Sequence, residues 1–157
     1  MKVLLSGAGR LPPRWRRALT RAALAALGPS ARKRAELCLV FVDDRRIRAL
    51  NRRFLGRPSA TDVIAFRYPD PLPRTPFPGG KEPLPPFGDV YVARGVAARQ
   101  ARALGHGLAE ELLTLAVHGA LHLAGHDDAR VADKRRMFAV QDRLVRRFLP
   151  RDARTAA

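Results

Sequence analysis

The stretch HGALHLAGHDD at residues 118–128 decides the expected fold and site. His118 and His122 are four residues apart, so a helix stacks their imidazoles on one face, one turn apart. Gly125 is where such a helix can end, because glycine adopts the left-handed cap conformation at little cost. The chain can then turn back and bring Asp128 to the same metal ion. The spacing therefore predicts a metal site on a helix late in the chain.

The same spacing occurs in the HExxHxxGxxH zinc proteins, where two helical histidines and a third ligand hold the metal. In the metalloproteases of this type, the glutamate after the first histidine is the general base. Gly119 stands at that position, which argues against proteolysis. The plain alternative is an ordinary helix whose histidines have satisfied ring nitrogens. We favour a metal site because three of the four histidines fall in this motif.

Two further motifs stand upstream: TDVIAF at 61–66 and GDVYV at 88–92. With the metal motif, and in this order, they resemble the YbeY family of bacterial metal-dependent endoribonucleases that mature ribosomal RNA. The family patterns are P-T-[DN]-V-L-S-F, G-D-[IV] and H-G-x-L-H-L-x-G-[YH]-D-H. The resemblance runs from about Leu37 to Phe148. Shorter matches to the family are Asn51, Phe54 and the pair Glu111–Leu112.

Two positions depart from the family pattern. Asp128 replaces the third histidine ligand; aspartate is a competent zinc ligand, but its charge shifts the site toward oxygen-preferring metals. Leu55 stands where many members have an arginine implicated in catalysis. Arg53 or Arg57 could reach the same place, although neither matches the family position, so that role stays unassigned. His126 competes with Asp128 as third ligand, although family members often have histidine there beside the true ligand.

Several carboxylates are candidates for the general base, unless the activated water itself serves, or for support of the ligands. Asp127 is adjacent to the third ligand. Glu111 lies two turns before the first histidine on nearly the same helical face, which favours a supporting role. Asp62 and Asp89 could come from strand ends near the site. Each acid has a plain alternative as a cap or a surface charge. His106, between two glycines, is expected to be a solvated loop residue.

Charge is the second strong signal in the sequence. Thirty lysines and arginines against fourteen acids give a net charge of +16, and most of the basic residues are arginine. This balance favours salt-sensitive binding to a polyanion, and arginine pairs with phosphate and stacks on bases. A GC-rich genome explains arginine over lysine, but not a twofold excess over acids. We therefore expect RNA or the ribosome as a partner. The resemblance implies single-stranded RNA, and ribosomal RNA in particular; no membrane partner is expected.

Length and composition predict one domain over residues 1–157, with enough apolar residues (46%) for a real core. No apolar run approaches the roughly 20 residues that span a bilayer, and the N-terminus is too short for a signal-peptide core. The single cysteine, Cys38, lies in an apolar run and forms no disulfide framework. Such cysteine usage fits a reducing compartment, so a cytoplasmic location is expected.

The apolar pattern predicts strands alternating with helices. Strands are expected at Val3–Ser6, Leu37–Val42, Thr61–Phe66 and Gly88–Val92. Helices are expected at Pro12–Leu27, from Asp43 or Asp44 to about Phe54, and at Arg94–Leu104, Leu108–Ala124 and Val131–Phe148. Such an order predicts an α/β or α+β fold around a small sheet. The resemblance implies a small mixed four-stranded sheet flanked by helices, with a core at about 37–148.

Residues 67–87 contain eight prolines and so are expected to form neither a helix nor a central strand. This proline-rich loop is long for a compact domain, so it is interpreted as a mobile insertion, with a functional flap as the alternative. The tail at 150–157 is expected to be frayed.

The sequence and the resemblance together predict a single-strand-specific, metal-dependent endoribonuclease. It would act in small-subunit ribosomal RNA maturation and in ribosome quality control. His118, His122 and Asp128 are expected to hold one zinc ion, or another divalent transition metal, with one position left for water. Two alternatives stay open. One is a basic RNA- or ribosome-binding factor with a structural metal, which a closed site including His126 would favour. The other is a metal-dependent hydrolase of a small substrate.

Overall fold

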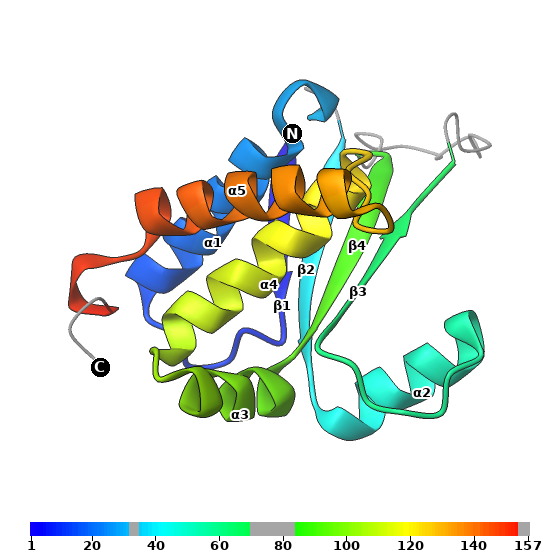
Figure 1. The fold of residues 1–157 in the computed structure, drawn as a ribbon, viewed down its shortest axis with the longest axis horizontal. Coiled ribbons are helices and arrows are strands. Elements are labelled where there is room, and N and C mark those ends of the chain that lie inside the picture. Colours follow the sequence, from blue (N-terminus) through cyan, green and yellow to red (C-terminus); the bar gives the residue numbers. More distant parts are fainter. Residues whose placement is uncertain (32–34, 70–83, 154–157) are drawn as a thin grey trace, which may run out of the picture.

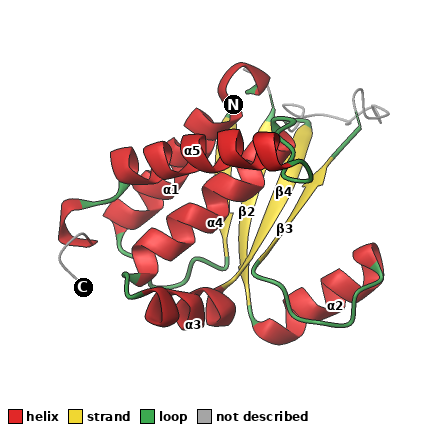
Figure 2. Ribbon diagram, in the orientation of Figure 1, coloured by secondary structure: helices red, strands yellow, loops and turns green. Residues whose placement is uncertain are grey.

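The computed structural model describes residues 1–31, 35–69 and 84–153. At its centre lies a four-stranded sheet in the order β1-β2-β4-β3. The strands β1, β2 and β4 are parallel, and β3 runs antiparallel to β4 along one edge. Their bounds are Lys2–Ser6 for β1, Glu36–Val42 for β2, Val63–Arg67 for β3 and Pro86–Ala93 for β4. The predicted small mixed sheet with flanking helices is confirmed (Figure 2).

One face of the sheet is covered by α1 (Pro13–Leu27) and α4 (Leu108–Leu123), and α5 (Val131–Phe148) packs across both helices (Figure 1). Successive strand residues point to opposite faces, so alternate apolar residues enter this layer. The fully buried members are Leu37 and Leu39 of β2 and Val90 and Val92 of β4. This main core fixes α4 against the sheet.

The helix α2 (Asp44–Leu55) lies on the opposite face, over β3 and β4 (Figure 1). Ile47 and Leu50 bury its apolar side in a smaller cluster against those strands. Asp43 caps the helix, accepting a hydrogen bond at 2.7 Å from the backbone amide three residues on. Gly56 ends it in the left-handed conformation, at φ 65°. The sheet therefore has a helix on each side, as predicted.

The helix α3 (Arg94–Leu104) follows β4 directly and leads through a glycine turn into α4. Its bounds, and those of α5, are those that the sequence predicts. The helix α4 ends one residue earlier than predicted, at Leu123. Short 3-10 turns cover Gly28–Ser30 and Arg151–Ala153.

The predicted limits of the proline-rich loop 67–87 were wrong, because both ends belong to the sheet. Arg67 is the last residue of β3, and β4 begins at Pro86. Proline is tolerated there because the first residue of a strand need not donate to the ladder. Residues 70–83 lie outside the described residues, and with them the interpretation as a mobile insertion.

The tail differs from the frayed end expected from residue 150. Ala153 is 6% exposed and closes the 3-10 turn, so the chain contacts the fold up to this residue. Residues 154–157 lie outside the described part.

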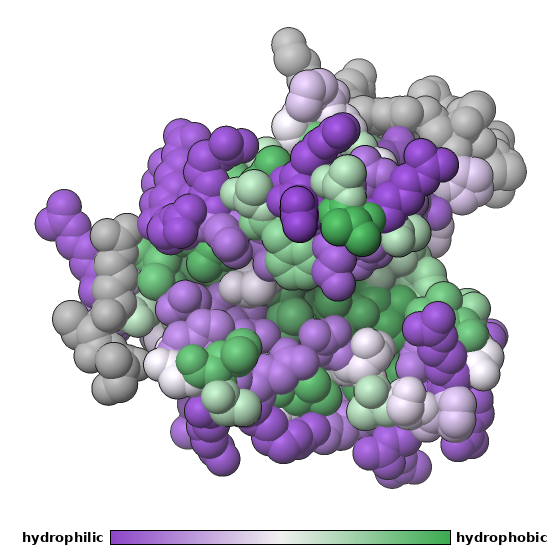
Figure 3. All heavy atoms as spheres, in the orientation of Figure 1, coloured by the Kyte–Doolittle hydropathy of each residue, from purple (hydrophilic) through white to green (hydrophobic). Residues whose placement is uncertain are grey.

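Hydrophilic side chains cover most of the molecular face drawn in Figure 3. Apolar side chains on that face gather at the bottom of a hollow between the upper helices and α2. Among the described residues, the structure has no helix long and apolar enough to cross a membrane.

Candidate metal centre

The helix α4 lies close against the sheet at Gly119. A Cβ atom there would lie 2.5 Å from Val90 Cγ1 and 3.3 Å from Val63 Cγ2. Any larger side chain, including the catalytic glutamate of the metalloproteases, would have to push the helix away from β4. The glycine therefore faces the core, and the histidine on the preceding position points out of it.

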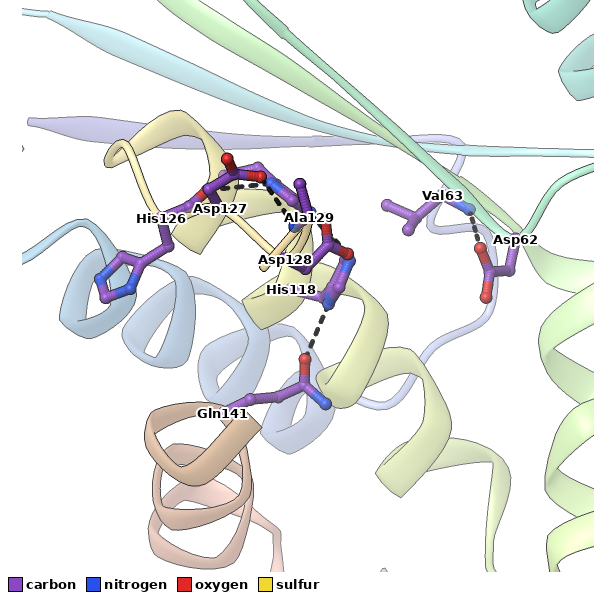
Figure 4. A network of polar contacts seen from close by, with 9 residues as sticks. Asp62, Val63, His118, His126, Asp127, Asp128, Ala129 and Gln141 are labelled. Carbon is purple, nitrogen blue, oxygen red and sulfur yellow. Dashed lines mark hydrogen bonds and ion pairs between the residues drawn. The ribbon is translucent and has the colours of Figure 1, made fainter. Parts of the chain in front are cut away.

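Two histidines of α4 face each other one turn apart. The Nε2 atoms of His118 and His122 are 3.1 Å apart, and their ring planes cross at 77°. The carboxylate Oδ2 of Asp128 lies 3.7 Å from His122 Nε2. One donor atom of each residue lies within 4.8 Å of the other two, and all three residues are half-buried. Figure 4 shows Asp128 beside His118. The structure thus brings together the three ligands expected from the sequence.

The other ring nitrogens bind oxygen atoms of the protein. His118 Nδ1 lies 2.9 Å from Gln141 Oε1 of α5 (Figure 4), and His122 Nδ1 lies 3.1 Å from the carbonyl oxygen of His126. Because both oxygens are acceptors, both Nδ1 atoms carry the hydrogen and donate it. In the neutral imidazoles, both Nε2 lone pairs then point into the ligand group. Two lone pairs at this distance repel each other, and a cation between them removes the repulsion.

The distances suit a tetrahedral ion. Bonds of about 2.0–2.1 Å at tetrahedral angles separate two ligand atoms by about 3.4 Å. The separations of 3.1 Å between the two imidazole nitrogens and 3.7 Å between nitrogen and carboxylate lie on either side of this value. If all three residues held a metal ion, they would leave the fourth tetrahedral position to water or substrate, which is the arrangement of catalytic rather than structural zinc sites.

The turn after α4 brings Asp128 back toward the helix. Gly125 has a φ of 97°, which favours glycine, and the amide of His126 donates to Leu121 at 3.0 Å. The imidazole of His126 points away from the ligand group (Figure 4), so this residue contributes its backbone carbonyl. Asp127 accepts a hydrogen bond at 3.0 Å from the backbone amide two residues on, which stabilises the turn.

The sequence suggested Glu111 as the residue that supports the ligands, but Glu111 lies at the opposite end of α4. Gln141 supports His118 instead. The Oε2 atom of Glu111 lies 2.6 Å from His106 Nε2, and its side chain is 5% exposed. Burial raises the pKa of the Glu111 carboxyl, and the hydrogen bond with His106 only partly opposes this effect. The prediction of His106 as a solvated loop residue was wrong, because its turn folds back onto the first turn of α4.

Asp62 and Asp89 have other partners than the ligand group. Asp62 accepts hydrogen bonds from the Val63 amide at 2.8 Å and from Gln100 Nε2 at 3.1 Å, which ties the start of β3 to α3. Asp89 alternates with the buried Val90 and so lies on the opposite face of the sheet from α4. It accepts a hydrogen bond at 2.7 Å from Tyr68 Oη, which, together with burial, raises the pKa of Tyr68 to about 12.

The segment in which the resemblance implies a catalytic arginine lies at the end of α2. Leu55 is 51% exposed, and Arg57, just after the helix, is exposed too. The Arg53 guanidinium lies 5.2 Å from the centre of the Phe54 ring, and that ring packs edge-on against Phe66 of β3. The catalytic role of an arginine in this segment stays a prediction.

Sequence reasoning missed Gln141 altogether. The residue is 4% exposed and lies in α5 one turn after the fully buried Met137. A lone amide on the apolar stripe of a helix was the available signal, because a buried polar side chain needs a partner.

Comparisons with known proteins show the family of the chain. The family model of endoribonuclease YbeY matches residues 12–149. A protein of Elusimicrobium minutum named endoribonuclease YbeY is 45% identical over 77% of this chain and 80% of its own. One of Geobacillus kaustophilus with the same name is 40% identical over 73% of each chain. The solution structure of a Thermotoga maritima protein shares the fold, with a TM-score of 0.57 over 91% of this chain and 86% of that one, at 24% identity. The chain therefore belongs to the YbeY family of endoribonucleases, as its three motifs predict.

Proposed function

We propose that this protein is a single-strand-specific, metal-dependent endoribonuclease that acts in small-subunit ribosomal RNA maturation and in ribosome quality control. The observation that carries the proposal is the convergence of His118, His122 and Asp128 on one point at the end of α4. Membership of an endoribonuclease family supports RNA as the substrate and hydrolysis as the reaction.

His118, His122 and Asp128 would hold one zinc ion, with another divalent transition metal as the alternative. When bound, the metal lowers the pKa of a water ligand and polarises a phosphoryl oxygen of the substrate. Gln141 and the carbonyl of His126 hold the imidazoles so that both Nε2 atoms face inward. Asp127 is a candidate for the general base, since it adjoins Asp128 in the turn, where its Oδ1 accepts a hydrogen bond from a backbone amide.

The charge of the protein supports a polyanionic substrate. The net charge of +16 draws phosphate groups to the surface, where arginine binds them bidentately. Exposed Arg57 is a candidate for contact with the scissile phosphate. Affinity for single-stranded RNA should therefore fall steeply as salt rises and depend weakly on sequence, because phosphate contacts carry no sequence information.

The binding-factor alternative requires a closed site with a fourth protein ligand. His126 is the nearest candidate in sequence, and its imidazole points away from the ligand group (Figure 4). The open geometry supports a catalytic centre, so we retain the enzyme as the better proposal.

The test incubates the protein and the His122→Ala variant with matched RNA and DNA strands, with and without a chelator and with ribosomes present or absent. We expect both strands to bind in a salt-dependent way, and only RNA to be cleaved by the parent protein in the absence of chelator. His126→Ala is the matched control and should cleave. Binding of both strands with cleavage of neither, under all these conditions, would favour the binding factor.

A further inference from the structure

Arg67, the last residue of β3, contacts the end of α4. Its Nη1 donates a hydrogen bond at 2.6 Å to the carbonyl oxygen of Leu123, the last residue of the helix and the neighbour of His122. The guanidinium carbon also lies 4.1 Å from the centre of the Phe87 ring. One side chain thus joins the sheet to the helix end beside the candidate metal centre.

The Leu123 carbonyl is one of those that a helix leaves without a helical partner. Amides of the following turn bind the carbonyls just before it: Ala124 donates to Leu121 at 3.1 Å, and Gly125 donates to His122 at 3.0 Å. Arg67, which belongs to β3, likewise donates a hydrogen bond to the next carbonyl, that of Leu123. A cation at the C-terminus of a helix is also favoured by the helix dipole.

The sheet holds Arg67 in place. In the antiparallel register, Arg67 pairs with Gly88, and the amide of Tyr68 donates to the carbonyl of Phe87 at 3.1 Å. The Phe87 ring is 4% exposed, so the guanidinium lies over a fixed surface. Gly88 itself lies against α4, since a Cβ there would be 3.0 Å from a side-chain methyl of Leu123. The strands and the helix end therefore pack together at one junction.

We propose that Arg67 is a positioning residue of the metal centre: it anchors the C-terminal end of α4 to β3 and β4. Through this anchor it sets the position of His122 and of the turn that carries Asp128. The inference rests on the proposed metal site. Outer groups that orient metal ligands are typically worth 10- to 100-fold in metal affinity, so loss of Arg67 should weaken zinc binding by about tenfold.

Charge alone predicts the opposite sign. A guanidinium near a dication repels it, so removing Arg67 would tighten zinc binding if the side chain acted only through its charge. If the side chain acts as an anchor, its removal weakens binding. Arg67→Lys separates the two effects further, because lysine keeps the charge but lacks the planar group that stacks on Phe87.

The test measures zinc affinity by competition with a chromophoric chelator for the parent, Arg67→Ala and Arg67→Lys. Arg102→Ala is the matched control. Arg102 is an exposed arginine in the last turn of α3, a helix that lies away from the C-terminal end of α4 (Figure 1). We expect about tenfold weaker binding for Arg67→Ala, an intermediate loss for Arg67→Lys and less than twofold change for the control. Unchanged or tighter binding by Arg67→Ala would overturn the proposal.

A second readout needs no metal. The amides of Gly125 and His126 are hydrogen-bonded in the turn, so their hydrogen exchange in metal-free protein reports its order. Arg67→Ala should accelerate their exchange and leave the first turns of α4 unchanged, and Phe87→Leu should act in the same direction. If the parent binds no zinc, the proposed metal centre is wrong. Hydrogen exchange then still tests whether Arg67 anchors the turn. Equal protection in the parent and both variants would refute it.

Discussion

His118 Nδ1 lies 2.9 Å from Gln141 Oε1, so a buried amide of α5 holds the first histidine of α4 by the nitrogen that faces away from the ligand group. The carbonyl oxygen of His126 likewise holds His122 by its Nδ1 nitrogen. Two different parts of the chain thus fix the two imidazoles, one by tertiary packing and one by a local turn. The two ligands should therefore respond to different mutations.

The Gln141 contact can be tested with two near-isosteric variants. Gln141→Leu removes the acceptor and leaves the His118 N–H without a partner, so zinc affinity should fall by roughly 10- to 100-fold. Gln141→Glu supplies a carboxylate acceptor and should retain the metal. Chelator competition measures both affinities. Equal affinities for parent and Gln141→Leu would show that the contact does not orient the ligand.

The third ligand is tested by exchanging residues of the turn. Asp128→Ala should cost more zinc affinity than His126→Ala, because the Asp128 carboxylate faces the histidines and the His126 ring does not. Asp128→His should restore the binding that Asp128→Ala loses, since histidine is itself a zinc ligand. The measurement is zinc titration of the three variants. A larger loss for His126→Ala would reverse the assignment.

Gly119→Ala should destabilise the fold although alanine is the better helix former. The added methyl group would meet Val90 Cγ1 at 2.5 Å, and overpacking of this kind costs about 1–3 kcal/mol. Denaturant unfolding gives the change in the free energy of unfolding. In a Val90→Ala background, the same substitution should cost little, because the clashing methyl is gone. An equal cost in both backgrounds would contradict this account of the close approach.

Glu111 should make stability depend on pH. Its pKa is raised in the folded protein by burial, so its contribution is full below the unfolded value, near 4.5, and is lost as pH rises through the folded value. Each unit of the shift is worth about 1.4 kcal/mol. Glu111→Gln should therefore gain stability relative to the parent as the pH rises above about 4.5.

The matched control for this trend is Glu110→Gln, which removes a carboxylate that is 35% exposed beside the same histidine. Unfolding curves at several pH values provide the comparison. A parent and Glu111→Gln variant that keep a constant stability difference across this range would rule out the burial effect.

Much of the fold could be predicted because local signals agree with the tertiary structure. Prolines begin α1, and glycines end α1 and α3. The apolar run at β2 forms a strand as predicted, although it is buried on one face and only half-buried on the other. The group of His118, His122 and Asp128 could also be predicted, because it lies within one helix and the turn that follows it. The spacing of the two histidines and the glycine that ends the helix indicate this group.

What could not be predicted depends on contacts between elements far apart in sequence. Gln141 reaches His118 only because α5 crosses α4, and Arg67 was assigned to a loop because prolines follow it closely. His106 was expected in solvent because glycines flank it, whereas its ring returns to a buried carboxylate five residues on. Glycine flanks define the turn but not the direction of the side chain between them.

Zinc content and RNA cleavage, measured on the same preparations, decide whether one metal centre on α4 performs the reaction. The parent protein and the His118→Ala/His122→Ala double variant are analysed for bound zinc and for cleavage of a single-stranded RNA. We expect about one zinc per parent chain. We also expect none in the double variant, cleavage by the parent alone, and activity that returns with stoichiometric zinc after chelation. Stoichiometric zinc in the double variant, or equal RNA cleavage by both proteins, would contradict this assignment.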